Sequence, residues 1–121
     1  MTEKQRWQVT LFLRLFKETA LQQFVFAERD TTLSTVATLG ITLKQAQECV
    51  LGICEKDYYR GPFKDQSPRG GEYWEFGVSV DGREVFVKLK VDTVNAVAVC
   101  FSFHFPDSPM VYPYRRGKGE K

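Results

Sequence analysis

The clearest pattern in the chain is an alternation of apolar and more polar positions across residues 72–91. A period of two is typical of β-strands that bury one face. Asp81-Gly82 interrupts the alternation, and this pair is preferred in two-residue type I′ hairpin turns. Because such a turn fixes the register, Val80 must lie opposite Arg83. The pattern therefore predicts a hairpin of two antiparallel strands, 72–80 and 83–91.

Counting back from this turn assigns the two faces of the hairpin. The apolar face pairs Val78 with Val85, Phe76 with Val87, and Trp74 with Leu89. On the opposite face, Glu75 is expected opposite Lys88, and Tyr73 opposite Lys90. The agreement of every apolar pair supports the register.

A third strand is predicted at residues 97–105, again from alternation. We expect one face to point to the core (Val97, Val99, Phe101, Phe103 and Phe105) and the other to lie with Glu75 (Ala98, Cys100, Ser102 and His104). The turn before this strand is longer, so its register does not follow from counting.

Helical patterns precede the strands. Residues 8–23 have apolar residues at i, i+4 spacing, although the alternation in 7–15 also fits a strand. A second helix is expected from Asp30 or Thr31 to Leu39, with Gly40 as its left-handed end. A third begins at Thr42, which has capping-box spacing to Gln45. Residues 61–71 are rich in Gly and Pro and predict a loop.

Together these patterns predict an α+β fold in which N-terminal helices pack on a twisted antiparallel β-sheet of at least three strands. The 121 residues and 43% hydrophobic content fit a single domain, 1–121. Within it, 107–121 is expected to be a partly flexible C-terminal extension. The net charge of +2 neither requires nor excludes a nucleic-acid partner.

Location follows from the cysteines and the N-terminal segment. Three cysteines, an odd number without Cys-x-x-Cys spacing, argue against a disulfide framework and a zinc site and indicate a reducing compartment. The apolar stretch near the N-terminus is short and is interrupted by Arg14 and Lys17. We therefore expect no membrane span and a cytoplasmic protein.

The residues that could carry chemistry are Glu75, Lys88 and His104, with Arg60 before the sheet. RNA cleavage without a metal needs a base for the 2′-OH proton, an acid for the leaving 5′-oxygen, and cations for the phosphorane. Glu75 could be the base and His104 the acid. Arg60 and Lys88 could be the phosphate clamps, with no metal and no cofactor.

Structural interpretations stand beside these roles. Glu75 and Lys88 could form an ordinary cross-strand ion pair, worth about 0.2–1 kcal/mol. Tyr59 and Tyr73 could stack on RNA bases, but aromatic residues are more often buried. The basic tail that begins at Arg115 could add phosphate affinity or could simply be a solvated chain end.

Four segments carry a family resemblance: VLGICEKDYYRGP, EYWEFGV, VFVKLKV and AVCFSFHF. In order, spacing and strand pattern they resemble the MqsR-type toxins of bacterial type II toxin–antitoxin systems, over roughly residues 8–105. The resemblance implies a RelE-like, barnase-related fold and a ribosome-independent mRNA interferase. It also implies an mRNA substrate and a cognate antitoxin protein that binds DNA.

The resemblance transfers site residues one at a time. Arg60 follows an aspartate–aromatic–tyrosine triplet and replaces the usual lysine, and Glu75 follows Trp74 where the prototype has glutamine. Phe86 falls on the family's tyrosine and lacks its hydroxyl, which leaves it a role in RNA binding but none in proton transfer. Lys88 matches a lysine, and His104 replaces the lysine of the last strand.

Three functional hypotheses follow. The first is an mRNA endonuclease toxin that is neutralised by its antitoxin. The second is a non-catalytic RNA- or protein-binding module on the same fold, which the loss of the tyrosine at Phe86 favours. The third is an enzyme of unrelated chemistry that uses Cys100, although no neighbour in sequence would activate its thiolate.

Overall fold

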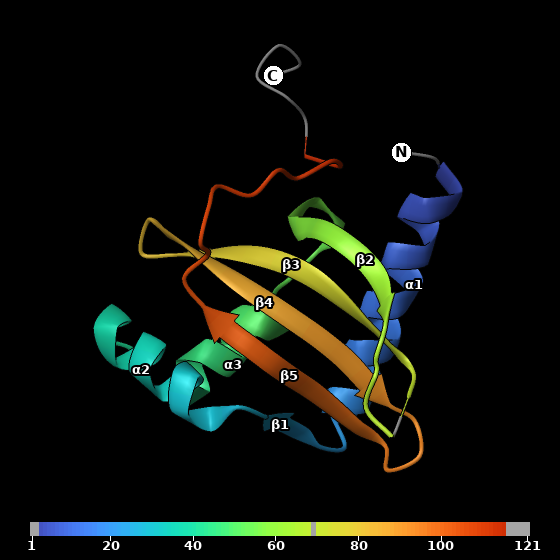
Figure 1. The fold of residues 1–121 in the computed structure, drawn as a ribbon, viewed down its shortest axis with the longest axis horizontal. Helices are drawn as coiled ribbons and strands as arrows, with labels where there is room; N and C mark the ends of the chain where they lie inside the picture. The colour runs from blue at the N-terminus through green and yellow to red at the C-terminus, as the bar shows by residue number, and fades with distance from the viewer. Residues whose placement is uncertain (1–2, 69, 116–121) are drawn as a thin grey trace.

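A computed structural model describes residues 3–68 and 70–115 and confirms the predicted α+β fold (Figure 1). Its elements, in chain order, are α1 (Glu3–Ala20), β1 (Phe24–Phe26), α2 (Arg29–Leu39), α3 (Leu43–Leu51), the 3₁₀ turn η1 (Glu55–Asp57), β2 (Tyr58–Lys64), β3 (Glu72–Val80), β4 (Arg83–Asp92) and β5 (Val97–His104). Within the described ranges, no helix has the length and apolar character needed to cross a membrane.

The strands form one mixed sheet in the order β1-β5-β4-β3-β2, in which β1 runs parallel to β5 and the other pairs are antiparallel. The predicted hairpin register is confirmed at every pair from Val80↔Arg83 to Tyr73↔Lys90. Asp81 and Gly82 have φ values of 52° and 80°, the positive values that a type I′ turn requires.

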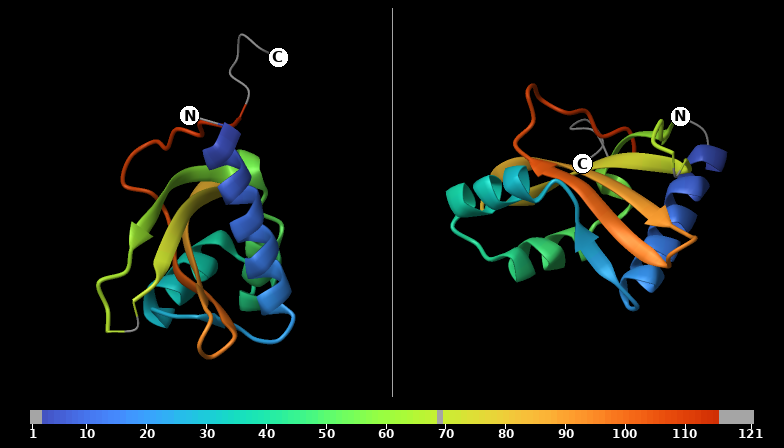
Figure 2. Two further views of the ribbon diagram at one scale, coloured as in Figure 1. Left: turned by 90° about the vertical axis from the view of Figure 1, so that its right-hand side faces the viewer. Right: turned by 60° about the horizontal axis from the view of Figure 1, so that its bottom comes forward.

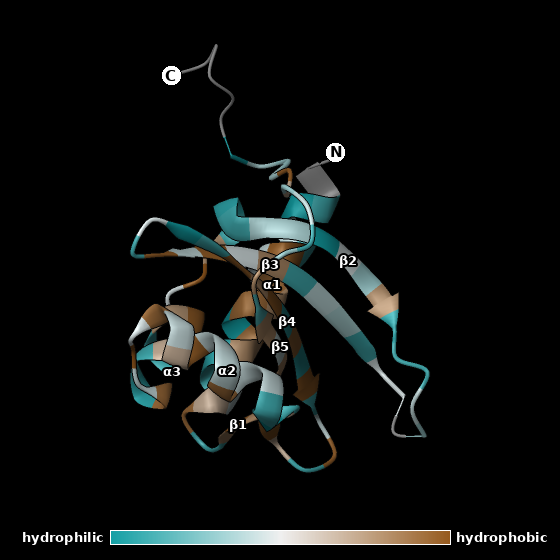
Figure 3. Ribbon diagram, turned by 60° about the vertical axis from the view of Figure 1, so that its left-hand side comes forward, coloured by the Kyte–Doolittle hydropathy of each residue, from teal (hydrophilic) through white to brown (hydrophobic). Residues whose placement is uncertain are grey.

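The helices cover one face of the sheet. α1 and α3 lie on one side of the strands, and the chain after β5 passes over the other side (Figure 2). Alternate residues of β3, β4 and β5 meet the helices in a core that includes Val9, Phe16, Val50, Phe76 and Leu89. Hydrophobic residues gather where α1, β4 and β5 meet, while the loop between β2 and β3 is hydrophilic (Figure 3). We call the face away from the helices the open face.

The predicted helices are present with shifted ends. The ambiguous segment near the N-terminus is a helix, α1, which starts and ends earlier than the predicted 8–23. Gly40 ends α2 with φ 74°, and the Thr42–Gln45 capping box begins α3, both as predicted. The short apolar segment Phe24–Phe26 is an additional strand, β1.

The predicted faces of β5 are wrong in its first half. The register shifts between Leu89↔Cys100 and Lys88↔Ser102, so Phe101 is the extra residue of a β-bulge. Because side chains alternate with a period of two, one extra residue exchanges the two faces. Ala98 and Cys100 are therefore buried in the core, whereas Val97, Val99 and Phe101 lie on the open face. After the bulge, Phe103 faces the core and His104 the open face, as predicted.

The predicted loop 61–71 is wrong in its first part, because β2 continues to Lys64. Two register shifts interrupt the pairing of β2 with β3, one on each side of Arg60. Gly61 has φ 122°, and a Cβ there would lie 3.2 Å from the Trp74 Cα and the Tyr73 carbonyl oxygen. The glycine thus lets an irregular strand approach β3 closely.

This close approach predicts that Gly61→Ala destabilises the protein by about 1–3 kcal/mol, because the strained φ and the backbone contact act together. Gly70→Ala is a matched control with φ 68° and nothing within 4 Å of its Cβ, and should cost about 1 kcal/mol. Urea unfolding measures both. Equal losses for the two variants would contradict the proposed contact with β3.

Candidate functional site

The open face brings together most of the predicted site residues. Strand pairing places Glu75 opposite Lys88 and Phe86 opposite His104. On the other side of β3, Arg60 is the partner of Glu75. Side chains from β2, β3, β4 and β5 therefore meet on one face, in spite of long separations along the chain.

Glu75 pairs with Arg60 and not with Lys88. The Arg60 Nε donates to Glu75 Oε1 at 2.9 Å, and the side chains are 55% and 7% exposed, respectively. Among the described residues no ion pair joins Glu75 to Lys88, so the ordinary cross-strand pair considered from sequence is absent. The Lys88 Nζ instead lies 4.7 Å from the Tyr73 ring centroid and 5.2 Å from that of Phe101, within the range of cation–π contacts.

The contact between Arg60 and Glu75 uses only part of the guanidinium. Arg has five N–H donors in a planar fork, and the bond to Glu75 uses the one on Nε. The ring of Tyr59 lies 4.6 Å from the Arg60 Cζ and supports the plane of the group. Both terminal nitrogens of Arg60 can therefore bind an anion while Nε still holds the carboxylate.

His104 is oriented by its neighbours. Its ring stacks on Phe86 with centroids 5.1 Å apart, and Phe86 meets the Tyr59 ring edge-on at 6.4 Å. The His104 Nδ1 lies 3.0 Å from the carbonyl oxygen of Phe105. A carbonyl oxygen can only accept, so Nδ1 carries the proton in this contact and Nε2 is the ring nitrogen left to take up or release a proton.

A cavity of about 230 Å³ joins these groups. Its lining consists of Tyr59, Arg60, Phe86 and His104 from the strands and Pro106, Asp107, Ser108 and Met110 from the segment after β5. The volume is below the roughly 300–1,000 Å³ of typical sites for small-molecule ligands. It suits one group, such as a nucleobase or a phosphate. Glu75 lies behind Arg60, and Lys88 lies outside the lining.

Residues 106–115, which we call the strap, supply one wall of this cavity through their first half, 106–110. The Tyr112 hydroxyl donates to Glu84 Oε2 at 2.6 Å, and burial together with this carboxylate raises the pKa of Tyr112. Tyr112 and Met110 lie directly over Gly77, where a Cβ would be 2.1 Å from the Tyr112 hydroxyl oxygen. Little in the sequence indicates this wall, because Gly77 resembles any other polar-face residue of its strand.

Arg115 lies away from the cavity lining. Its Nη2 donates to Asp57 Oδ1 at 2.9 Å, and its Cζ lies 4.0 Å from the Tyr112 ring centroid. The residue predicted to bind RNA therefore ties the strap to η1. The remainder of the predicted flexible extension, 116–121, lies outside the described residues.

Cys100 is fully buried, and burial raises the pKa of its thiol to about 12. The structure contradicts the hypothesis of an enzyme that uses Cys100, because the nucleophile would have to be an exposed thiolate. Within residues 3–68 and 70–115, no group of three or more His, Cys, Asp or Glu residues could hold a metal ion.

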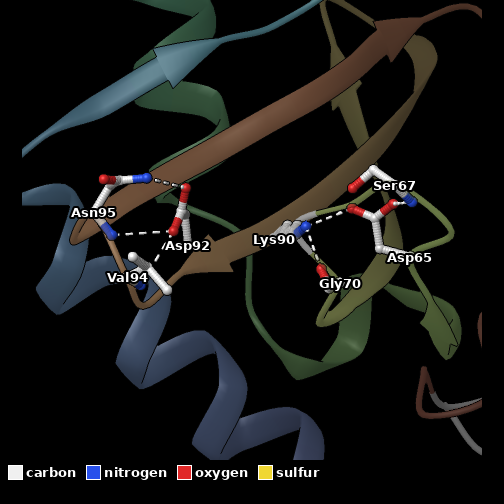
Figure 4. A network of polar contacts seen from close by, with 7 residues as sticks. All are labelled: Asp65, Ser67, Gly70, Lys90, Asp92, Val94 and Asn95. Carbon is white, nitrogen blue, oxygen red and sulfur yellow. Dashed lines mark hydrogen bonds and ion pairs between the residues drawn. The ribbon is translucent and has the colours of Figure 1, made fainter.

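At the other end of the open face, Lys90 fastens the loop between β2 and β3 (Figure 4). Its Nζ donates to Asp65 and, at 2.6 Å, to the carbonyl oxygen of Gly70. The hydrogen bond from Lys90, helped by the backbone N–H of Ser67, lowers the pKa of Asp65 to about 2. Lys90 is thus engaged within the protein.

No protein-family model matches the chain, and no curated protein or solved structure is similar enough to count as a match. The resemblance to MqsR-type toxins therefore stays a prediction. The functional argument depends on the geometry of the open face.

The bond between Lys90 and Asp65 predicts a pH-dependent contribution to stability. The pKa of Asp65 is lowered in the folded state, so its stabilising effect is complete above the unfolded value near 3.8 and is lost as pH falls through about 2. Asp65→Asn should therefore lower the thermal midpoint at pH 7, and its difference from wild type should shrink between about pH 4 and pH 2.

Asp81→Asn is the matched control for this variant. Asp81 lies in the exposed turn between β3 and β4, where Asn is equally suited. Thermal unfolding of this variant should follow the wild type at every pH. A constant difference between Asp65→Asn and wild type across the pH range would contradict the proposed ion pair.

Proposed function

We propose that the protein is a ribosome-independent mRNA endonuclease, a toxin that cleaves single-stranded RNA without a metal and is neutralised by a cognate antitoxin. The observation that carries the proposal is the cavity in which Arg60 and His104 meet the aromatic rings of Tyr59 and Phe86. Cleavage of RNA without a metal requires a cation and a group that exchanges protons. The rings beside them offer surfaces on which bases can stack.

The proposed reaction proceeds through the RNA's own 2′-hydroxyl. Glu75 accepts the 2′-OH proton as the 2′-oxygen bonds to phosphorus, and the bond from phosphorus to the 5′-oxygen breaks. The His104 imidazolium gives its Nε2 proton to this 5′-oxygen. The products are a 2′,3′-cyclic phosphate and a 5′-hydroxyl end, and no oxidant or reductant is needed.

The bond between Arg60 and Glu75 supports these roles. When the Arg60 terminal nitrogens hold the scissile phosphate, its Nε keeps the Glu75 carboxylate beside that phosphate. Glu75 Oε2 accepts no hydrogen bond from any described residue, which leaves it for the 2′-hydroxyl. Arg60 thereby couples phosphate binding to the placement of the base.

Tyr59 and Phe86 have a binding role in this proposal. A base next to the scissile phosphate can stack on rings that already line the cavity, and such stacking tolerates any base. Phe86 lacks a hydroxyl and takes no part in proton transfer. Lys88, outside the cavity, serves a neighbouring phosphate.

The partner and location belong to the same proposal. The resemblance to MqsR-type toxins supports an antitoxin protein that binds DNA, and an mRNA substrate implies action in the cytoplasm. A non-catalytic RNA-binding module is the second candidate. It is favoured by Phe86 in place of a tyrosine and by the burial of Glu75 beneath Arg60.

Cleavage in EDTA tests the endonuclease directly. Purified protein should cut a 5′-labelled single-stranded RNA, and the labelled fragments should end in 2′,3′-cyclic phosphates. His104→Ala should lower the rate about 10²–10⁴-fold, because a general acid is removed. Val94→Ala, on the exposed turn between β4 and β5, should cleave as wild type does.

Growth arrest on induction should follow the same order as cleavage among these variants. RNA that is bound in a salt-dependent way but never cut would support the binding module instead. Cleavage at the wild-type rate by a folded His104→Ala protein would rule out the proposed acid.

Two substitutions of Glu75 separate the role of a base from that of a support for Arg60. Glu75→Gln keeps an oxygen that can accept from the Arg60 Nε but cannot take a proton. It should lower kcat about 10²–10⁴-fold with KM nearly unchanged. Glu75→Ala should also raise KM, because Arg60 loses its partner.

The pH profile distinguishes the two roles further. If Glu75 is the base, the loss of rate at low pH in the wild type should disappear in Glu75→Gln. Near-normal kcat in Glu75→Gln would instead make Glu75 a positioning residue.

A further inference from the structure

A second group of aromatic rings lies on the open face, outside the cavity lining. Phe63 of β2, Tyr73 of β3 and Phe101 of β5 form a row across the sheet, with neighbouring ring centroids 5.4 and 5.5 Å apart. The ammonium of Lys88 lies over both Tyr73 and Phe101. We call this row the aromatic platform.

Packing in the hydrophobic core does not explain why these three rings lie together. None of the three belongs to the hydrophobic cluster beneath the helices or packs against it. Phe63 is 36% exposed, and Tyr73 and Phe101 are partly exposed. Phe101 reaches the open face only because of the bulge in β5, which turns a residue of the expected core toward solvent. Rings held in a row beside a cation on a solvated sheet can bind nucleobases by stacking.

The register sets the distance from the platform to the cavity. Along β3, Tyr73 precedes Gly77 by four residues, and Gly77 pairs with Phe86 at the cavity. Four residues of strand span about 13 Å. A few nucleotides cover this distance, because stacked nucleotides advance by about 3.4 Å each and unstacked nucleotides by more. Lys88 lies between the two groups, where it can meet the phosphates of the connecting chain.

We propose that the aromatic platform is a second base-stacking subsite, for a nucleobase of single-stranded RNA a few nucleotides from the base that stacks in the cavity. The phosphate held by Arg60 lies between the two bases, since the Arg60 Cζ is 5.8 Å from the Phe63 ring centroid. The inference rests on the proposed function, because it takes its ligand from there. Its neighbour is a cavity of about 190 Å³ in which Phe101 meets Asp65, Ser67 and Lys90.

The test uses 2′-O-methyl oligonucleotides of two to eight nucleotides, which lack the attacking hydroxyl and so report binding alone. Fluorescence anisotropy should show that wild-type affinity rises about tenfold or more once the oligonucleotide spans both groups. The double variant Tyr73→Leu, Phe101→Leu keeps apolar bulk but has no ring faces. It should lose this increase and keep the affinity for the dinucleotide.

Phe24→Leu is the matched control, because it removes a ring on the helical side of the sheet. This variant should retain the rise of affinity with oligonucleotide length. A length dependence that survives in the double variant, or a wild-type protein that binds two and eight nucleotides equally, would overturn the platform and leave the proposed endonuclease standing.

Cleavage of unmodified RNA, measured beside binding, distinguishes the proposed platform from the proposed endonuclease. Length-dependent binding through Tyr73 and Phe101 without any cleavage would overturn the endonuclease and support the platform. Failure of the wild type both to bind and to cleave would overturn both.

Discussion

The pairing of β3 with β4 is the constraint on which both faces of the sheet depend. Its register runs without a shift from Val80↔Arg83 to Tyr73↔Lys90. A slip by one residue would move Glu75 into the core and Trp74 to the open face, at the cost of burying a charge and exposing a large ring. The other strands build on this hairpin, β2 carrying Arg60 and β5 carrying His104.

The ion pair between Arg60 and Glu75 links this framework to the proposed chemistry. A carboxylate that is only 7% exposed needs a partner, since a buried unpaired charge is strongly destabilising. A lysine could supply the charge, but its single ammonium would be divided between Glu75 and a phosphate. The guanidinium fork allows both at once. Arginine at position 60 therefore suits a buried glutamate at position 75, because one guanidinium can hold the carboxylate and an anion together.

The fold could be predicted where local rules act alone. Alternation and a two-residue turn gave the hairpin, and capping chemistry gave the starts and ends of helices such as α3. The bulge at Phe101 could not be predicted, because it depends on how β5 fits β4 and leaves no mark in the alternation. Gly61-Pro62 looks like the start of a loop, although the chain there remains paired with β3.

The same limits decide which residues of the candidate site could be predicted from the sequence. Glu75, Phe86 and His104 were placed on one face correctly, because that face follows from alternation. The partner of Glu75 was missed, since Lys88 was the nearest cation by register and no strand was predicted before residue 72. Phe63 and Phe101 were missed because one was placed in the predicted loop 61–71 and the other in the core.

The proposed site divides its tasks between rigid and irregular parts of the chain. Glu75 and His104 lie on the paired strands β3 and β5, and Arg60 is held to β3 by its pairing and its bond with Glu75. The size of the cavity is set instead by the strap, an irregular segment that lies over Gly77 and is fastened by Tyr112. Changes in the strap can therefore alter which groups enter the cavity without moving the residues proposed to cleave RNA.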